Sequence, residues 1–289
     1  MSKTVLITGA TGTVSRQVIH YLKGKGHRLI ALVRNPEYVE PLEAEGLEVR
    51  LGDLEKSWTL DAAFEGIDTL WLVNPPTARA PEQSSNAVWA ARKAGVKRIV
   101  RLSVICAEYN APIQGQRLHA LSDAELMASG MEWTILRPHF FMQNLLGMAA
   151  PAIAAGKSMD NFLDNGRIGL IDVRDIGELA AQALVSNEHA GQIYTLTGPE
   201  TLSLEDVAQK ISHATGRLVT TRSVTPTREY FQGLGAGEWL ANLNADFMST
   251  YVTNWGILPA AILKGLWEEH PADLMILSAT MRSLSPHPE

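Results

Sequence analysis

The stretch Val5–Ser15, VLITGATGTVS, joins a short apolar run to a glycine-rich turn and then to an amphipathic segment. Glycine lets the backbone come close to a ligand where a side chain would block it. The apolar spacing after the turn predicts a helix, whose first N–H groups and positive dipole end face the turn. We therefore expect a strand–turn–helix unit that binds the pyrophosphate of a dinucleotide through Gly9, Thr11, Gly12, Thr13 and Val14.

The glycine spacing is Gly9-x-x-Gly12-x-x-Ser15, which differs from the Gly-x-Gly-x-x-Gly fingerprint of many dehydrogenases. Ser15 stands where a third glycine would allow close packing of helix on strand. Serine is small, so we expect it to be tolerated at some cost in contact distance.

Strand-like and helix-like segments alternate through the first half of the chain. Strands are predicted at residues 4–8, 28–33, 47–51, 69–73, 98–103 and 133–136, and helices at 14–25, near 60–64, 82–94 and 116–128. Strands separated by helices imply right-handed crossovers. The fold class is therefore α/β, with a Rossmann-like parallel sheet and helices on both faces.

The pattern loosens after Arg137-Pro138. We predict a nucleotide-binding domain at residues 1–150 and a smaller, mostly helical substrate lobe at 151–289, with segments such as 170–197 packing back on the sheet. Capping boxes at Asp175–Glu178 and Ser203–Asp206 predict two helices, the second of which closes at Gly216, and a strand is expected at 192–196. Aromatic residues of the tail are expected in the core: Trp239, Phe247, Tyr251, Trp255 and Trp267.

Composition limits the classes of partner. The 289 residues carry a net charge of −6, which disfavours nucleic acid, and their only basic cluster (Lys93, Lys97, Arg98, Arg101) is interpreted as a solvated helix end and turn. One cysteine, Cys106, permits no intrachain disulfide and favours the cytoplasm. We see no leader, no run of 18 apolar residues and no zinc-ligand spacing, so we expect a small-molecule partner, no membrane and no metal. A homodimer is left open.

The residue that ends the second strand selects the dinucleotide. NAD sites place an acidic residue there to hold the ribose 2′-hydroxyl. Here the strand ends at Arg34, whose planar fork matches a 2′-phosphate, so NADP(H) is favoured over NAD(H). Asp53 and Leu54, after the third strand, are expected to meet the adenine, and Asn74 and Pro75, after the fourth, to lie under the nicotinamide.

Several motifs resemble one family. Residues 6–12 (LITGATG), 32–36 (LVRNP), 94–97 (AGVK), 129–138 (SGMEWTILRP) and 173–176 (VRDI) are similar to those of NmrA-like atypical short-chain dehydrogenase/reductases. Within that family, the likeness is closest to bacterial NADPH–quinone oxidoreductases and triphenylmethane-type dye reductases. The resemblance implies hydride transfer from NADPH to a flat, electron-poor acceptor such as a quinone.

The chain departs from the family's usual catalytic pair. Short-chain dehydrogenases commonly use Tyr-x-x-x-Lys, which occurs here only as Tyr21 to Lys25 on the first helix. Related reductases carry a lysine eleven positions before the glycine that precedes strand six, and counting back from Gly130 gives His119. We expect His119 to donate a proton and Asp123, one helical turn on, to orient its ring or raise its basicity. If solvent protonates the reduced quinone, His119 is expected only to line the pocket or to touch the nicotinamide ribose.

Other family positions complete the candidate site. Ser103 ends strand five, where this superfamily often has a catalytic serine. His139, Phe140, Phe141 and Asn144 follow strand six and are expected to contact substrate. Alternative functions are an NADP(H)-binding redox sensor without turnover and a reductase of imines or dyes. A sugar-nucleotide epimerase is disfavoured because the Tyr-x-x-x-Lys pair is missing.

Overall fold

The computed structural model describes residues 2–252 and 274–276, which form two compact units. The first unit comprises residues 1–137 and 176–194, and the second comprises 138–175 and 195–289. The boundary therefore lies after Arg137 instead of at residue 150. Residues 176–194 return to the first unit, so each unit is built from two stretches of chain.

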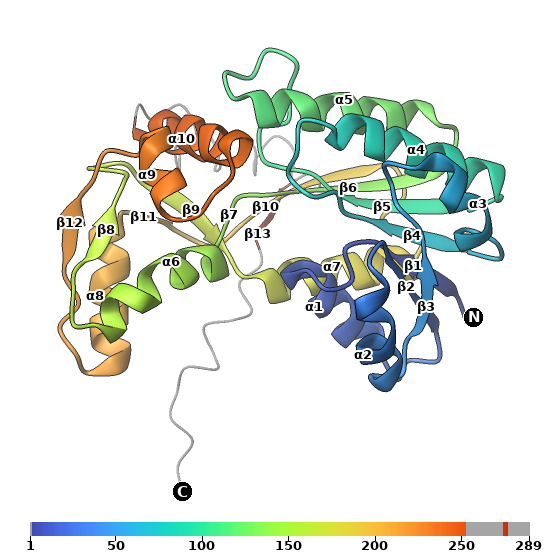
Figure 1. The fold of residues 1–289 in the computed structure, drawn as a ribbon, viewed down its shortest axis with the longest axis horizontal. Helices are drawn as coiled ribbons and strands as arrows, with labels where there is room; N and C mark the ends of the chain where they lie inside the picture. The colour runs from blue at the N-terminus through green and yellow to red at the C-terminus, as the bar shows by residue number, and fades with distance from the viewer. Residues whose placement is uncertain (1, 253–273, 277–289) are drawn as a thin grey trace, which may run out of the picture. The chain divides into compact units, whose positions relative to one another are not determined.

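The main sheet has the strand order β13-β10-β6-β5-β4-β1-β2-β3 (Figure 1). Its strands are β1 Thr4–Ile7, β2 Arg28–Val33, β3 Glu48–Leu51, β4 Thr69–Leu72, β5 Arg98–Leu102, β6 Glu132–Pro138, β10 Gln192–Thr197 and β13 Leu274–Ile276. The chain runs outward from β1 in both directions, as it does in a Rossmann sheet. Neighbouring strands from β3 to β6 pair in parallel, which confirms the predicted Rossmann-like architecture.

Helices cover both faces of this sheet. In Figure 1, α3, α4 and α5 lie on one side, and α1, α2 and α7 lie on the other. Their bounds are α1 Thr13–Leu22, α2 Val39–Ala44, α3 Leu60–Ala63, α4 Ala80–Lys93, α5 Gln114–Ala128 and α7 Val173–Val185, with single 3₁₀ turns at Pro36–Tyr38 and Ser57–Thr59. The core beneath α3 and α4 includes Leu6, Leu70 and Ile99, all fully buried.

Helix α7 packs directly against α1. A Cβ atom added to Gly177 would lie 2.3 Å from Cβ of Gln17, so a glycine is required for the two helices to approach this closely. The apolar side of α1 is buried too, at Val14, Val18 and Leu22. Residues after 175 are therefore part of the first unit's packing.

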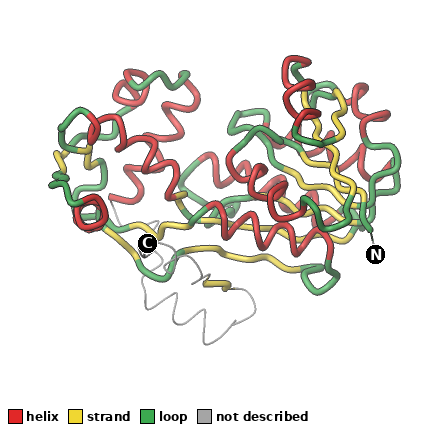
Figure 2. The backbone as a smooth tube through the Cα atoms, turned by 90° about the horizontal axis from the view of Figure 1, so that it is seen from below, coloured by secondary structure: helices red, strands yellow, loops and turns green. Residues whose placement is uncertain are grey.

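Helices are the main regular structure of the second unit, as predicted, and Figure 2 shows more helix than strand in it. Its helices are α6 Met142–Ala154, α8 Leu204–Thr215, α9 Arg228–Gly233 and α10 Glu238–Val252. Two small sheets, with orders β11-β9-β7 and β12-β8, were not predicted. Their strands are β7 Phe140–Phe141, β8 Met159–Asn161, β9 Ile168–Ile171, β11 Thr201–Leu202 and β12 Thr221–Ser223.

The first residues of α7 and α8 show whether the two predicted capping boxes form. Ser203 and Asp206 form the reciprocal pair that begins α8, and Gly216 ends it in the left-handed conformation, as predicted. The box at Asp175 is wrong, because α7 already begins at Val173. The Asp172 carboxylate accepts from the backbone N–H of Arg174 at 2.8 Å and takes the capping place.

The tail aromatics are tested only in part. Phe247 packs against the second unit's core, and Trp239 is half-buried. Trp255, Trp267 and the side chain of Tyr251 lie outside the described residues. Within the described part, no helix has the length and apolar character needed to cross a bilayer, and no three potential metal ligands gather.

Candidate active site

The glycine turn after β1 is shaped for an anion. Gly9 has a φ of +57°, and Gly12 is the N-cap of α1 without a side-chain cap. Gly12 N–H donates to the Gly9 carbonyl at 2.8 Å, and a Cβ on Gly12 would lie 3.1 Å from that same oxygen. No acidic residue occupies the first turn of α1. The helix thus presents its positive end where the turn leaves room for a ligand.

Ser15, which replaces the third glycine, has a structural role of its own. Its hydroxyl donates to the Thr8 carbonyl at 3.1 Å and accepts from the indole N–H of Trp71 at 2.9 Å. Ser15 and Trp71 are both almost completely buried. The expected cost in packing is therefore offset by two buried hydrogen bonds, one to the residue after β1 and one to β4.

Arg34 follows the last residue of β2 and is exposed. Within the described residues, no hydrogen bond or ion pair engages its guanidinium. The next residue, Asn35, accepts from the backbone N–H of Glu37 at 3.2 Å and begins the 3₁₀ turn. The turn after β2 therefore leaves the arginine available to a phosphate.

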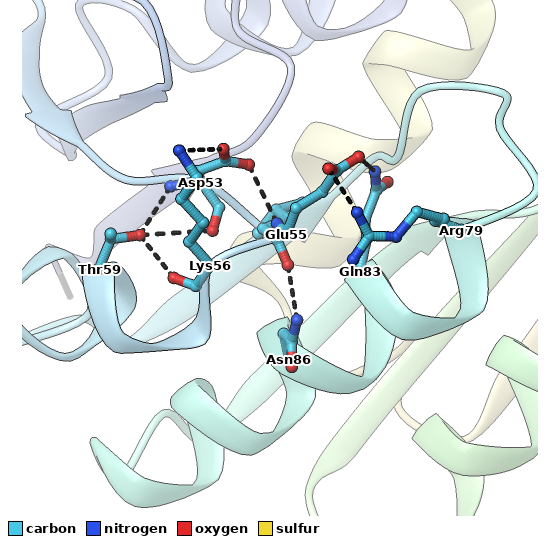
Figure 3. A network of polar contacts seen from close by, with 8 residues as sticks. Asp53, Glu55, Lys56, Thr59, Arg79, Gln83 and Asn86 are labelled. Atoms are coloured by element: carbon cyan, nitrogen blue, oxygen red, sulfur yellow. Dashed lines mark hydrogen bonds and ion pairs between the residues drawn. The ribbon is translucent and has the colours of Figure 1, made fainter.

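Asp53 and Leu54 lie in a turn that other residues hold in place, and Figure 3 shows the contacts of Asp53 and Glu55. The Asp53 carboxylate accepts from the Glu55 backbone N–H at 3.0 Å, and the Leu54 carbonyl accepts from Asn86 of α4 at 2.8 Å. Glu55 in turn accepts from Arg79 at 2.9 Å and from Gln83 at 3.0 Å. The side chain of Leu54 packs on the core. Contact of this turn with adenine stays a prediction.

Asn74, at the end of β4, holds an unused donor. Its Oδ1 accepts from the Ser84 hydroxyl at 2.8 Å, whereas its Nδ2 is buried and has no partner among the described residues. An unpaired buried amide is costly unless a ligand satisfies it. Asn74 therefore fits the predicted cofactor contact, while the neighbouring Pro75 is exposed.

A buried carboxylate organises the catalytic candidates. Asp123, on α5, is completely buried and accepts from the Arg101 guanidinium, from Ser103 Oγ at 2.8 Å and from Arg137 at 3.0 and 3.1 Å. We call Arg101, Ser103, Asp123 and Arg137 the arginine–aspartate cluster. Two guanidinium groups facing one carboxylate leave a net positive charge beneath His119.

His119 contacts this cluster through Arg101. Arg101 Nη2 lies 3.3 Å from His119 Nδ1, and because a guanidinium only donates, Nδ1 must accept and Nε2 carries the ring proton. Burial and the charges of Arg101 and Arg137 lower the pKa of His119 to about 3. The imidazole is therefore neutral at physiological pH, and Nε2–H is the donor that its ring has to offer.

Two sequence-based interpretations are corrected here. Asp123 does not orient His119, because its carboxylate is taken up by two arginines and Ser103. Arg101 and Arg98 are also not solvated, being 1% and 2% exposed. Arg98 bonds to the Ser186 carbonyl and to Glu132. Sequence reasoning missed Arg101 and Arg137 as site residues, although two arginines in apolar strands were a signal that they need a buried partner.

The expected substrate residues belong to the second unit. His139 is 7% exposed, and its Nδ1 accepts from the Phe140 backbone N–H at 2.7 Å. Phe140 packs against that unit's core, Phe141 is half-buried and Asn144 is exposed. His139 is buried and Phe140 is engaged by the core of the unit, so Phe141 and Asn144 are the members of this set most open to a ligand.

Comparison with known proteins identifies the family. Residues 9–189 match the model of the NAD(P)H-binding family, a span that begins at the first glycine of the turn. The chain belongs to this NAD(P)H-binding family.

The relatives of this chain include reductases. The NAD(P)H azoreductase of Xenophilus azovorans is 36% identical over 240 residues, covering 82% of this chain and 84% of the relative. Quinone oxidoreductase 2 of Escherichia coli is 29% identical over 248 residues, covering 84% and 86%. The crystal structure of the E. coli NADPH-dependent quinone oxidoreductase with NADPH superposes with a TM-score of 0.77 at 26% identity, covering 91% and 94%. These findings confirm the resemblance to NmrA-like reductases.

Proposed function

We propose that this member of the NAD(P)H-binding family is an NADPH-dependent oxidoreductase that reduces a flat, electron-poor acceptor such as a quinone. The proposal rests on an open glycine turn followed by an Arg34 that has no partner among the described residues, in a chain whose relatives include an azoreductase and a quinone oxidoreductase. A dye with an azo or imine bond is the alternative acceptor.

Residues of the first unit would hold the cofactor. The N–H groups at residues 11–14 would bind the pyrophosphate, and Arg34 the 2′-phosphate. Asp53 and Leu54 would meet the adenine, while Asn74 Nδ2, Pro75 and Ser103 would lie on the nicotinamide side. NADPH supplies the hydride when bound, and the protein's task is to orient it and to stabilise charge on the acceptor.

His119 would provide that stabilisation without ionising. Hydride addition leaves negative charge on an oxygen or nitrogen of the acceptor, and Nε2–H can donate to that atom. Arg101 fixes the donor tautomer, Asp123 holds Arg101, and Arg137 in turn bonds to Asp123. His119 is thus a hydrogen-bond donor instead of the acid expected from the sequence, and the proton comes from water.

Phe141 and Asn144 are the proposed acceptor contacts in the second unit. An aromatic ring and one amide suit a flat molecule with a polar edge. His139 and Phe140 would support these two residues from the lobe's core.

Turnover tests the proposal directly. NADPH oxidation is followed at 340 nm with quinones, azo dyes and imines, with calorimetry of NADPH binding as the companion measurement. Turnover of a quinone supports the proposal, whereas tight binding without turnover on any acceptor would leave the redox-sensing alternative in its place.

The Arg34 assignment has a matched control on the same strand. Arg34→Ala should weaken NADPH binding at least tenfold and change NADH binding little, because a lost charge-assisted phosphate contact costs about 1.5–3 kcal/mol. Arg28→Ala, at the opposite end of β2, removes an exposed arginine paired with Glu48 and should affect neither. Equal losses for both dinucleotides would refute the assignment.

A homodimer and a cytoplasmic setting belong to the same proposal. The side chain of Trp89 on α4 is 62% exposed beside Glu125 and Ala128 of α5, a surface that a second copy could cover. The single Cys106 is free, which suits a reducing compartment. Analytical ultracentrifugation of the wild type and of Trp89→Glu tests the dimer, which the variant should dissociate.

A further inference from the structure

The second unit contains a cavity of about 710 Å³ that the proposed reaction does not use. Its lining comes from α6, from β8 and β12 with the residues beside them, and from α9, all within this unit. Figure 1 shows β8 and β12 as neighbouring strands, with α6 beside β8. The volume lies in the range of small-molecule pockets, so a ligand of that size can be accommodated.

One wall of the cavity is apolar. It is formed by Leu145, Met148 and Ala149 of α6 and by Met159 and Phe162 of the β8 region. Four of these are nearly fully buried, at 1–3% exposure, whereas Met148 is half-buried. Such a surface favours a hydrocarbon or aryl group, because contact removes apolar area from water.

The rim of the cavity is polar and carries three charged side chains. Asp160 accepts from Arg222 Nε at 2.5 Å and from the Tyr230 hydroxyl at 2.7 Å, so both carboxylate oxygens are used. Burial opposes ionisation, but the hydrogen bonds of Arg222 and Tyr230 hold the pKa of Asp160 below its usual value. The negative charge of Asp160 is therefore present and is balanced by Arg222.

Positive charge is left over at this rim. The two Nη groups of Arg222 have no hydrogen-bond partner in the described part of the chain, and Lys157, also on the rim, forms no ion pair there. Counting Asp160, Arg222 and Lys157 gives a local charge of one positive unit. The free donors and the excess charge lie beside the apolar wall, which is the arrangement that an amphipathic anion needs.

We infer that this cavity binds an apolar organic anion, whose hydrocarbon or aryl body lies against α6 and β8 and whose carboxylate or sulfonate contacts Arg222 and Lys157. A neutral molecule could offer the guanidinium donors only a weaker, uncharged acceptor, and a cation would be repelled by Lys157. The inference does not depend on the proposed reductase activity, because it concerns binding without cofactor.

Calorimetry on the full chain without NADPH tests the inference. The probes are decanoate and naphthalene-2-sulfonate, with 1-decanol, 2-naphthol and decyltrimethylammonium as neutral and cationic counterparts. We expect at least one anion to bind at least tenfold more tightly than its neutral counterpart and the cation not to bind. Failure of both anions to bind, or equal affinity for anion and neutral counterpart, would overturn the inference.

Variants locate the site. Lys157→Gln and Arg222→Gln should each weaken anion binding about tenfold, and Met148→Trp should weaken it by filling the cavity. Lys210→Gln is the matched control, because Lys210 lies on α8 of the same unit, pairs with Glu200 and does not line the cavity. Unfolding curves establish that the variants are folded. Equal losses in Lys157→Gln and Lys210→Gln would place the anion elsewhere and overturn the inference.

Discussion

The imidazole of His119 lies beside two guanidinium groups, and this neighbourhood decides what the ring can do. Burial and positive charge both disfavour a second proton, which lowers the pKa of His119 to about 3. Arg101 also fixes the position of the remaining proton, because it can only donate to Nδ1. A ring held in this state gives a constant hydrogen-bond donor over the physiological range.

Removal of this donor should therefore have an effect that does not vary with pH. His119→Ala should lower turnover with a quinone roughly 5- to 100-fold, as expected for a lost hydrogen bond of about 1–3 kcal/mol. The ratio of wild-type to variant kcat should stay constant from pH 5 to 8, because the ring is neutral throughout. A ratio that changes around pH 6.5 would instead indicate an ionising acid.

Stability supplies a second measurement on the same residue. An unfolded histidine titrates near 6.5, whereas the folded ring titrates near 3, so the unfolded chain binds more protons between these values. The wild type should thus lose more unfolding free energy than His119→Ala as pH falls from 7 to 4. Parallel losses in the two proteins would contradict the lowered pKa.

Sequence patterns could find His119 and Asp123 but not the partners that define them. Spacing along α5 places both on one helix face, which suggested that they meet each other. The contacts actually come from Arg101 on β5 and Arg137 on β6, which are distant in sequence from α5. Pairing between elements depends on the packed sheet, and local spacing does not encode it.

Elements of the first unit were predictable because their apolar runs are bounded by glycines and polar turns. Predicted and observed strands agree within one or two residues, and β2 agrees at both ends. The second unit was harder. Its strands have two to four residues, too few to show alternation, and α6 contains Pro151 in its last turn, where a helix is not expected.

The crossing of α7 on α1 gives a prediction at this scale. Gly177→Ala should destabilise the protein by about 1–3 kcal/mol, because the added methyl group would lie 2.3 Å from Gln17 Cβ. Gly147→Ala, inside α6, is the control: its Cβ would meet nothing within 4 Å, so alanine should stabilise by up to about 1 kcal/mol. Chemical denaturation measures both, and a neutral Gly177→Ala would show that α7 does not pack this closely.

At the scale of the whole molecule, the chain passes from one unit to the other three times, after residues 137, 175 and 194. The sequence pattern loosens after Arg137, which is where the packing changes, whereas the predicted domain boundary was placed later, at residue 150. The first unit is completed by α7, where Ile176, Ala180 and Leu184 are fully buried. Sequence order therefore does not divide this protein into separable halves.

A fragment ending at the first crossing should not fold on its own. Residues 1–137 lack α7, so the surface of the first unit that buries Ile176, Ala180 and Leu184 would face water. We therefore expect no cooperative thermal unfolding and rapid proteolysis. The full chain under the same conditions is the control. A cooperative transition for the fragment, followed by circular dichroism, would show that α7 is dispensable.

Ser15 connects two ends of the nucleotide turn that a glycine would leave independent. Through Thr8 and Trp71 it joins the start of α1 to β4, the strand that ends beside Asn74. Replacing Ser15 with the glycine of the dehydrogenase fingerprint would therefore leave the indole N–H of Trp71 buried without its hydrogen-bond partner. A sequence motif or a design rule that requires the third glycine would therefore miss turns of this kind. Here the hydrogen bonds of a serine side chain, and not the absence of a side chain, set the geometry of the turn.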